Sequence, residues 1–320
     1  MKDVPVFIVN GFLESGKSSL ILDTLRDPEF NDGGKTLLLL CEEGEVEFDP
    51  LDMKKLNTDI LVLEAQDELN PYMLESCRKQ YDPDRVMIEF NGTWNLGPVL
   101  KMDLPKGWLM AQILTLVDAS TFEQYWNNMR GVMGEQLRYS DTIIFNRCDE
   151  KTDRIKIRRA VKPLNRKAQL IYEPLPGIEL QDQEEPPVFD LSENPIQIPD
   201  DDFGMWYMDA MDHPERYKGR DIHFKGLVYK DKSCKKGTFI PGRMAMSCCV
   251  NDMAFVGFIC NYAPEDESLV QFVPKQKKWV DVVASVAYGY RPEYGAEGPI
   301  LTAKSIKPAD KPENEVVYFS

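Results

Sequence analysis

The stretch Gly11-Phe12-Leu13-Glu14-Ser15-Gly16-Lys17-Ser18 fits the pattern G-x-x-x-x-G-K-S/T, the loop that cradles nucleotide phosphates. The apolar, β-branched run of residues 4–9 precedes it and predicts a buried parallel strand, and residues 19–26 can form a helix after it. A strand, a glycine-rich loop and a helix N-terminus in this order direct backbone N–H groups and the helix dipole at an anion. A fortuitous glycine-rich turn is the alternative, and it leaves this context unexplained.

The residue types of the loop indicate their roles. Lys17 is expected to reach the β- and γ-phosphates and to act in catalysis, and the Ser18 hydroxyl is expected to ligate Mg2+. We expect the nucleotide to be bound by Gly11, Glu14, Ser15, Gly16, Lys17, Ser18 and Ser19.

The composition is that of a soluble globular protein: 320 residues, 43% hydrophobic and 28% charged, enough for one large or two ordinary domains. Seven cysteines without a regular framework favour reduced thiols. The net charge of −15 disfavours binding to nucleic acid or to an anionic membrane. No apolar run approaches the roughly 20 residues that span a bilayer, and no signal-peptide pattern opens the sequence, so we expect a cytoplasmic location without membrane insertion.

Apolar runs alternate with helix-length stretches through the first half of the chain. The pattern predicts helices at 71–80, 121–130 and 153–161, and strands at 6–9, 36–41, 60–63, 85–90, 112–117, 142–145 and 169–172. Such alternation indicates an α/β P-loop domain with a mainly parallel sheet and helices on both faces. Ligands of such sheets bind at the carboxyl ends of the strands.

The composition changes after the last of these strands. We expect residues 1–175 to form the P-loop domain, 176–212 to form an acidic, proline-rich linker or wrapped segment that ends in a short helix at 203–212, and 213–320 to form a second domain. The predicted strands of the second domain are 221–229, 243–250, 255–260, 279–288, 300–306 and 316–319. Short strands without clear helices are typical of a small all-β barrel such as an OB-fold.

The sequence Asn146-Arg147-Cys148-Asp149 follows the predicted strand 142–145 and indicates which base is bound. Asp149 can accept two hydrogen bonds from guanine, from N1–H and the 2-amino group, and adenine leaves that carboxylate unpaired. Asn146 can bond the base or brace the phosphate loop, and Arg147 can stack on the base. A helix cap is the alternative reading of this short motif.

Two further strand ends carry acidic residues. Glu89, in the run 85–92 that resembles a Walker B strand, is expected to hold Mg2+ and to act in catalysis, with the Gly92 N–H facing the γ-phosphate. An ordinary buried strand that ends in a turn is the alternative. The segment 41–45 lies where a switch segment would be, and its carboxylates either ligate metal or position water, or belong to a solvated acidic loop. Cys41 and Glu42 are its candidate transition-metal ligands.

At these motifs the chain resembles the CobW-type GTPases, which are related to the HypB and UreG metal-insertion proteins. The resemblance covers about residues 4–172 in five ordered motifs: 11–19, 41–49, 88–92, 116–119, and Gln136 with 140–149. It implies GTP and Mg2+ as cofactors, a client protein or metal-site protein as partner, and a homodimer as one assembly.

The chain departs from the family pattern at two places. The family's Cys-x-Cys-Cys metal motif is replaced by residues 63–70, which contain no cysteine, so thiolate coordination of Zn2+ is excluded there. Glu14 replaces a glycine of the phosphate loop, and its carboxylate repels a triphosphate unless it points outward or meets a cation.

The second domain resembles a different module, found on the soluble partner of a predicted bacterial permease pair, over residues 217–229 and 243–252. Cys248 and Cys249 are either small core residues or ligands of Zn2+ or another transition metal, although neighbours on a strand point to opposite faces. Lysines between 232 and 278 form either a solvated charged face or an OB-type groove for nucleic acid, the less favoured reading.

Together these observations predict a GTPase that hydrolyses GTP to GDP with Mg2+, slowly without an activator, and that couples the cycle to a partner protein or metal. A GTP-dependent binding scaffold without turnover and a GTPase-regulated nucleic-acid binder are the two alternatives.

Overall fold

The computed structural model describes residues 2–42, 44, 46–183, 185–230, 234–246, 253–262, 274–292 and 296–319. It divides into two compact units, Met1–Gln183 and Glu184–Ser320, which are described separately. No helix in these residues is long and apolar enough to cross a membrane.

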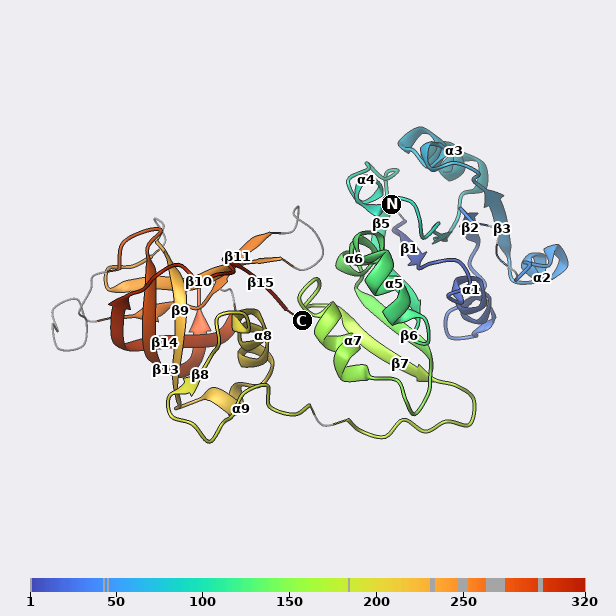
Figure 1. The fold of residues 1–320 in the computed structure, drawn as a ribbon. Coiled ribbons are helices and arrows are strands. Elements are labelled where there is room, and N and C mark those ends of the chain that lie inside the picture. Colours follow the sequence, from blue (N-terminus) through green and yellow to red (C-terminus); the bar gives the residue numbers. More distant parts are fainter. Residues whose placement is uncertain are drawn as a thin grey trace. The chain divides into compact units, whose positions relative to one another are not determined.

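The first unit is built on a seven-stranded parallel sheet in the order β3-β2-β4-β1-β5-β6-β7 (Figure 1). Its strands are β1 (Val4–Asn10), β2 (Thr36–Leu40), β3 (Thr58–Val62), β4 (Arg85–Glu89), β5 (Trp108–Asp118), β6 (Thr142–Cys148) and β7 (Gln169–Pro174). All seven predicted strands and the predicted α/β class are confirmed. The strands read as nearly continuous apolar runs because both faces of a parallel sheet are buried.

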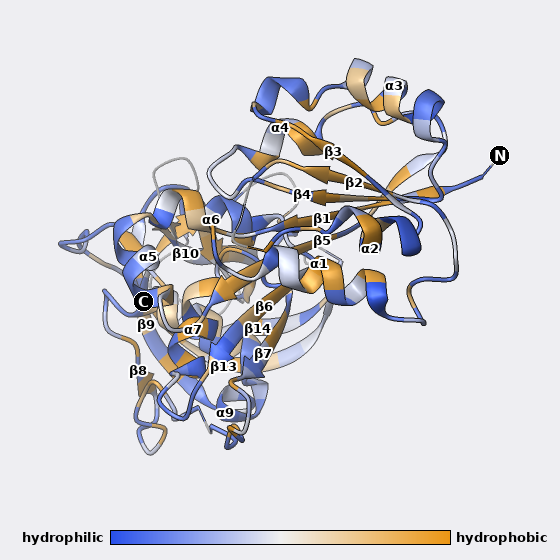
Figure 2. Cartoon of the chain, turned by 90° about the vertical axis from the view of Figure 1, so that its right-hand side faces the viewer, coloured by the Kyte–Doolittle hydropathy of each residue, from blue (hydrophilic) through white to orange (hydrophobic). Residues whose placement is uncertain are grey.

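Helices cover both faces of this sheet, whose strands are coloured as hydrophobic in Figure 2. One face packs on α1 (Lys17–Arg26) and α2 (Pro50–Lys55), which bury Ile21, Leu25 and Met53 against it. The other face packs on α3 (Pro71–Tyr81), α4 (Leu96–Leu100), α5 (Phe122–Asn128), α6 (Arg130–Arg138) and α7 (Arg154–Val161). A 3-10 turn, η1 (Gln66–Glu68), lies between β3 and α3.

The predicted helix 121–130 is two helices in the structure, α5 and α6, which meet at Met129. Met129 has φ −130° and ψ 31°, outside the helical region. Two asparagines that end α5 and the glycine near the start of α6 have low helix propensity, which explains the break.

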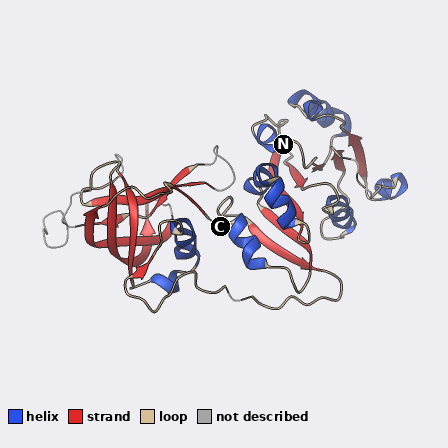
Figure 3. Ribbon diagram, viewed as in Figure 1, coloured by secondary structure: helices blue, strands red, loops and turns tan. Residues whose placement is uncertain are grey.

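The second unit is a five-stranded closed barrel with two short helices beside it (Figure 3). Around the barrel the order is β9 (Asp221–Tyr229), β13 (Trp279–Arg291), β14 (Ala296–Pro308), β12 (Cys260–Asn261) and β10 (Thr238–Met246), and β10 pairs with β9 to close it. β11 (Ala254–Gly257) and β15 (Val316–Tyr318) also pair with β10. The predicted small OB-like barrel is confirmed.

One predicted strand of the barrel, 255–260, is two strands in the structure, β11 and β12. Gly257 ends β11 against β10, where an added Cβ would lie 2.8 Å from the Pro241 carbonyl oxygen. Phe258 and Ile259 then turn into the interior instead of continuing the ladder.

Part of the segment predicted as linker packs into the barrel unit. β8 (Ile196–Gln197) pairs with β9 in parallel, and α8 (Phe203–Asp212) buries Phe203 and Trp206 in the barrel core. α9 (Pro214–Tyr217) follows it. The alternative of a wrapped, extended segment therefore describes residues 185–202 better than a free linker does.

Candidate nucleotide-binding site

The phosphate loop lies at the carboxyl edge of the sheet, between β1 and α1. Gly16 caps α1 with φ +97°, and Gly11 has φ +136°. A Cβ on Gly11 would lie 2.3 Å from the Leu116 carbonyl oxygen, so both the backbone conformation and the space around it require glycine. The tight loop directs the first N–H groups of α1 at one point, as an anion site requires.

Lys17 is buried, and each contact of its ammonium is to an oxygen. Its Nζ donates to the carbonyl oxygens of Gly11 at 2.9 Å and Phe12 at 3.0 Å, and to Glu42 Oε2 at 2.6 Å. The two side chains are 2% and 11% exposed, so the ion pair is shielded from water. The sequence did not indicate this contact between Glu42 and Lys17.

Ser18 and Glu89 meet at the head of α1. Ser18 Oγ donates to Glu89 Oε1 at 2.7 Å, while Oε2 is buried without a hydrogen-bond partner among the described residues. Burial raises the pKa of Glu89, and the bond from Ser18 and the charge of Lys17 only partly oppose this. A hydroxyl and an unsatisfied carboxylate oxygen side by side are hard oxygen donors, so these residues fit Mg2+.

A small cavity of about 100 Å3 joins these groups. Its lining comes from the phosphate loop and the start of α1, from the segment after β2, and from β4 and β6: Leu13, Glu14, Gly16, Lys17, Ser18, Ser19, Glu42, Gly44, Val46, Glu89 and Arg147. A Cβ on Gly44 would lie 3.4 Å from Ser18 Oγ, so this segment lies directly over the start of α1. The structure thus brings together most of the predicted phosphate and metal residues.

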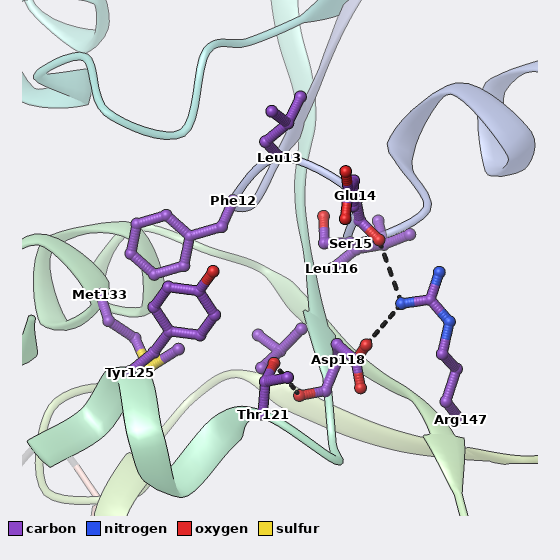
Figure 4. Close-up of a pocket in the computed structure, with 11 residues that line it drawn as sticks. Phe12, Leu13, Glu14, Ser15, Leu116, Asp118, Thr121, Tyr125, Met133 and Arg147 are labelled. Atoms are coloured by element: carbon purple, nitrogen blue, oxygen red, sulfur yellow. Dashed lines mark hydrogen bonds and ion pairs between the residues drawn. The ribbon is translucent and has the colours of Figure 1, made fainter. Parts of the chain in front are cut away.

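Glu14 lies at the tip of the loop, exposed, in a left-handed conformation with φ +64°. Its backbone carbonyl accepts a hydrogen bond from Arg147 Nη1 at 3.0 Å, drawn in Figure 4. A glycine would adopt this backbone conformation without strain. At Glu14 the hydrogen bond from Arg147 stabilises it instead. Glu14 is exposed, although it also contributes to the lining of the cavity.

The predicted base-binding motif braces the same loop. Asn146 Nδ2 donates to the Ser15 carbonyl at 2.7 Å, which agrees with one of its two expected roles. Arg147 Nη1 also pairs with Asp118 Oδ2 at 2.6 Å (Figure 4). Burial raises the pKa of Asp118, but hydrogen bonds from Ser120 and Arg147 outweigh it and leave that pKa below its usual value.

Asp149 is half-buried at the end of β6. Its Oδ1 accepts from the Lys151 N–H at 2.9 Å and from Thr152 Oγ1 at 3.0 Å, and the bond from Thr152 is the main reason why its pKa is lowered. No donor among the described residues reaches Oδ2. The carboxylate therefore stays ionised and keeps one oxygen for a ligand, although it also acts as the turn cap of the alternative reading.

Gly92 is buried against the phosphate loop itself. A Cβ at Gly92 would lie 2.2 Å from the Gly11 carbonyl oxygen, so only glycine fits. The predicted Walker B turn and the phosphate loop are therefore in direct backbone contact.

A second pocket, of about 230 Å3, adjoins the loop on its other side (Figure 4). Phe12 and Tyr125 stack with ring centroids 4.6 Å apart and form one wall, and Asp118 and Arg147 lie at the polar end. The sequence indicated neither ring. Asp118 had two signals, its place at the end of an apolar strand and its place in the motif 116–119.

Asn10, the last residue of β1, is a further residue that the sequence did not single out. It is 1% exposed, and neither polar atom of its side chain has a hydrogen-bond partner among the described residues. A polar residue at the end of an apolar run was its signal.

The transition-metal predictions find less support in the geometry. Burial raises the pKa of Cys41 to about 12, with the charge of Glu89 adding to the effect, so this buried thiol is protonated at neutral pH unless a metal displaces the proton. Cys248 and Cys249 lie outside the described residues.

In the second unit, Glu185, Asp209 and His213 bring ligand atoms within 4.8 Å of one another. Arg216 Nη1 lies 2.6 Å from Asp209 Oδ1, so a guanidinium already supplies the positive charge of that cluster.

Comparison with protein-family models matches residues 5–172 to the CobW/HypB/UreG nucleotide-binding domain and residues 179–319 to the DUF1980 C-terminal domain. The comparison with curated proteins gives no match.

Among solved structures, the Zn(II)-bound YjiA GTPase from E. coli is 20% identical with a TM-score of 0.44, over 57% of this chain and 60% of that one. The hydrogenase maturation factor HypB from Archaeoglobus fulgidus is 20% identical with a TM-score of 0.34, over 54% and 81%. HypB from Helicobacter pylori in complex with nickel is 12% identical with a TM-score of 0.34, over 53% and 79%. The chain thus spans about 60% of the length of the E. coli protein.

The first family model extends over more than half of the chain, from the strand before the phosphate loop to the last strand of the parallel sheet. The resemblance inferred from five motifs is confirmed, and the chain belongs to the CobW/HypB/UreG family of P-loop GTPases.

Proposed function

We propose that this chain binds GTP with Mg2+ and hydrolyses it to GDP, in order to act on a client protein or its metal site. The observation that carries the proposal is the joint placement of the Lys17 ammonium, the Ser18 hydroxyl and the orphan oxygen of Glu89 around one cavity. In this arrangement a cation and a site for a divalent metal flank the N-terminus of α1, where phosphates bind.

Each residue has a part in the proposed reaction. The loop N–H groups and Lys17 stabilise the negative charge that develops on the γ-phosphate, and Ser18 with Glu89 holds the metal. Mg2+ held by these two residues would neutralise part of the phosphate charge. Asp149 selects guanine through Oδ2, while Asn146 and Arg147 keep the loop in the shape that binding needs.

Phosphate binding also has to break an internal contact. Lys17 reaches a γ-phosphate only if Glu42 releases it, because Glu42 Oε2 lies 2.6 Å from Nζ. The release frees a carboxylate beside the reacting phosphate, where it is placed to order a water molecule or to join the metal shell. Because nucleotide binding must first separate this shielded ion pair, we expect slow turnover without an activator.

The test is nucleotide titration with Mg2+ and measurement of phosphate release. The full chain should bind GTP in preference to ATP, and Lys17→Ala should lose binding. Asp149→Asn should shift the preference toward xanthosine nucleotides, whose 2-oxo group accepts where guanine donates. Unchanged GTP affinity in Lys17→Ala would falsify the assignment of the loop.

The client remains a separate part of the proposal. Among the similar structures, YjiA has Zn(II) bound and one HypB has nickel bound. Membership of the same family supports a metal client for this chain. Since residues 63–70 contain no cysteine, thiolate ligands for a client metal would have to come from another part of the chain. Elemental analysis of the full chain with GTP and with GDP decides whether metal is held and whether the nucleotide changes its amount.

A further inference from the structure

Gln136 is a buried polar residue of α6 that the proposed mechanism does not use. It is 3% exposed, and its Nε2 donates a hydrogen bond to the carbonyl oxygen of Gly92. A buried amide is retained in a core only if its polar atoms are satisfied, so this bond fixes the direction of the side chain.

The acceptor lies at the centre of the proposed site. Gly92 is three residues after Glu89, in the turn that follows β4, and it touches the backbone of Gly11. A rotation of the Gly92 peptide therefore moves the backbone next to the phosphate loop. The Gly92 carbonyl belongs to the peptide that links Gly92 to Thr93, so the bond from Gln136 fixes that peptide and thereby limits where the rest of Gly92, with its own N–H, can lie.

Hydrogen bonds also hold the end of α6, the helix that carries Gln136. Ser140 Oγ bonds the Gln136 carbonyl at 2.8 Å and Thr115 Oγ1 at 2.5 Å, so the end of α6 is tied to β5. Ser140 and Thr115 are both almost completely buried. Gln136 thus connects the turn to the sheet by hydrogen bonds and not by apolar packing alone.

We propose that Gln136 is a positioning residue that orients Gly92 for the γ-phosphate and thereby favours GTP over GDP. The inference rests on the proposed function, because it assumes that the phosphate loop binds guanine nucleotides. GDP lacks the phosphate that the Gly92 N–H would contact, so its binding does not depend on the orientation of this turn. Gln136 acts through Gly92 and touches no nucleotide atom.

The experiment compares affinities for GDP and for a non-hydrolysable GTP analogue with Mg2+ in the full chain. Gln136→Met keeps the length of the side chain and removes the donor, and Gln136→Glu keeps its shape and replaces the donor with an acceptor while ionised. Gln66→Met is the matched control, because Gln66 bonds the backbone of the same turn at Asn95, three residues beyond Gly92.

Both Gln136 variants should weaken the GTP analogue about tenfold and change GDP affinity less than twofold, and the control should change neither. Equal loss for both nucleotides, or no loss, overturns the positioning role. If the parent chain binds neither nucleotide, the proposed function fails instead. Thermal melts of the variants show that they are folded, and Gln136→Glu serves if Gln136→Met is not.

Discussion

Lys17 and Glu42 show how one ion pair can set the affinity of a phosphate site. Both side chains are largely buried, so the attraction between their charges is screened less than in a surface ion pair. A triphosphate must compete with this attraction. The sequence identifies Lys17 through the phosphate-loop motif but does not indicate its partner, because Glu42 lies 25 residues further along the chain.

Glu42→Gln should therefore bind GTP about tenfold more tightly, since the neutral amide holds Lys17 less strongly and repels the phosphates less. Glu47→Gln, an exposed glutamate on the same segment, changes the net charge equally and should have no effect. Calorimetric titration measures both. Weaker binding by Glu42→Gln would show that Glu42 serves the metal more than it opposes the phosphate.

The raised pKa of Glu89 predicts a pH dependence of metal binding. Mg2+ requires the ionised carboxylate, so affinity should fall as the pH is lowered through a pKa that lies above the ordinary value of 4.5. Titration of Mg2+ against the protein with bound nucleotide at several pH values measures the midpoint, and Glu89→Gln should bind weakly at every pH. A midpoint at or below that of a free glutamate contradicts the burial argument.

The same group affects stability with the opposite sign. A carboxyl whose pKa is raised on folding binds more protons in the native state than in the unfolded one. Without metal, its contribution to the free energy of unfolding is full below the unfolded pKa and is lost as the pH rises through the folded pKa. Bound Mg2+ removes this loss because it compensates the buried charge.

At the scale of elements, the site depends on the turn after β4 lying against the loop after β1. Gly92 makes that contact possible, because a methyl group there would lie 2.2 Å from backbone. Gly92→Ala should destabilise the fold by roughly 1–3 kcal/mol and weaken nucleotide binding, as overpacking forces the two loops apart. Gly131→Ala, a glycine with no atom within 4 Å of an added Cβ, should be harmless.

Urea unfolding and GTP titration of the two glycine variants provide the measurement. Equal behaviour of Gly92→Ala and Gly131→Ala would mean that the backbone contact is unimportant.

The strands show why some elements were predictable and others were not. β1, β4 and β6 each contain an apolar run that is followed by a polar residue, such as Glu89 or Asn146, so both the strands and their functional ends were visible. The break between α5 and α6 depends on a single residue, Met129, and a pattern averaged over a helix does not resolve it. β8 has only two residues, too few to show a period.

At the scale of the molecule, the two compact units have separate cores. Each buries its own apolar surface, so we expect them to unfold as two transitions in calorimetry of the full chain. GTP with Mg2+ at 100 times its Kd stabilises only the unit that binds it, by about 2.7 kcal/mol, or roughly 5–10 °C for a unit of this size. An equal shift of both transitions would show that the units are energetically coupled.

A buried arginine stabilises the barrel unit through contacts within that unit alone. Arg243, fully buried, bonds Asp200 Oδ1 at 2.6 Å and the carbonyls of Lys225 and Asn314, and its guanidinium lies 4.7 Å from the centre of the Trp279 ring. One side chain thereby connects four separated segments of the second unit. Because the buried guanidinium of Arg243 makes a hydrogen bond from each of its three nitrogens, it specifies one arrangement of these segments.

The order of residues by itself determined the class of the protein, since the phosphate loop requires local features only: two glycines with unusual backbone angles, a lysine, a hydroxyl, and the strand and helix on either side. It also determined the parallel sheet and the barrel, because apolar runs separated by helix-length stretches indicate the first and short strands without clear helices indicate the second. Only the tertiary structure decided which distant side chains meet: Glu42 on Lys17, Arg147 on Asp118, Gln136 on Gly92. These contacts are made by residues 25 to 44 positions apart, and their geometry depends on how the strands are ordered in the sheet, which no local pattern records.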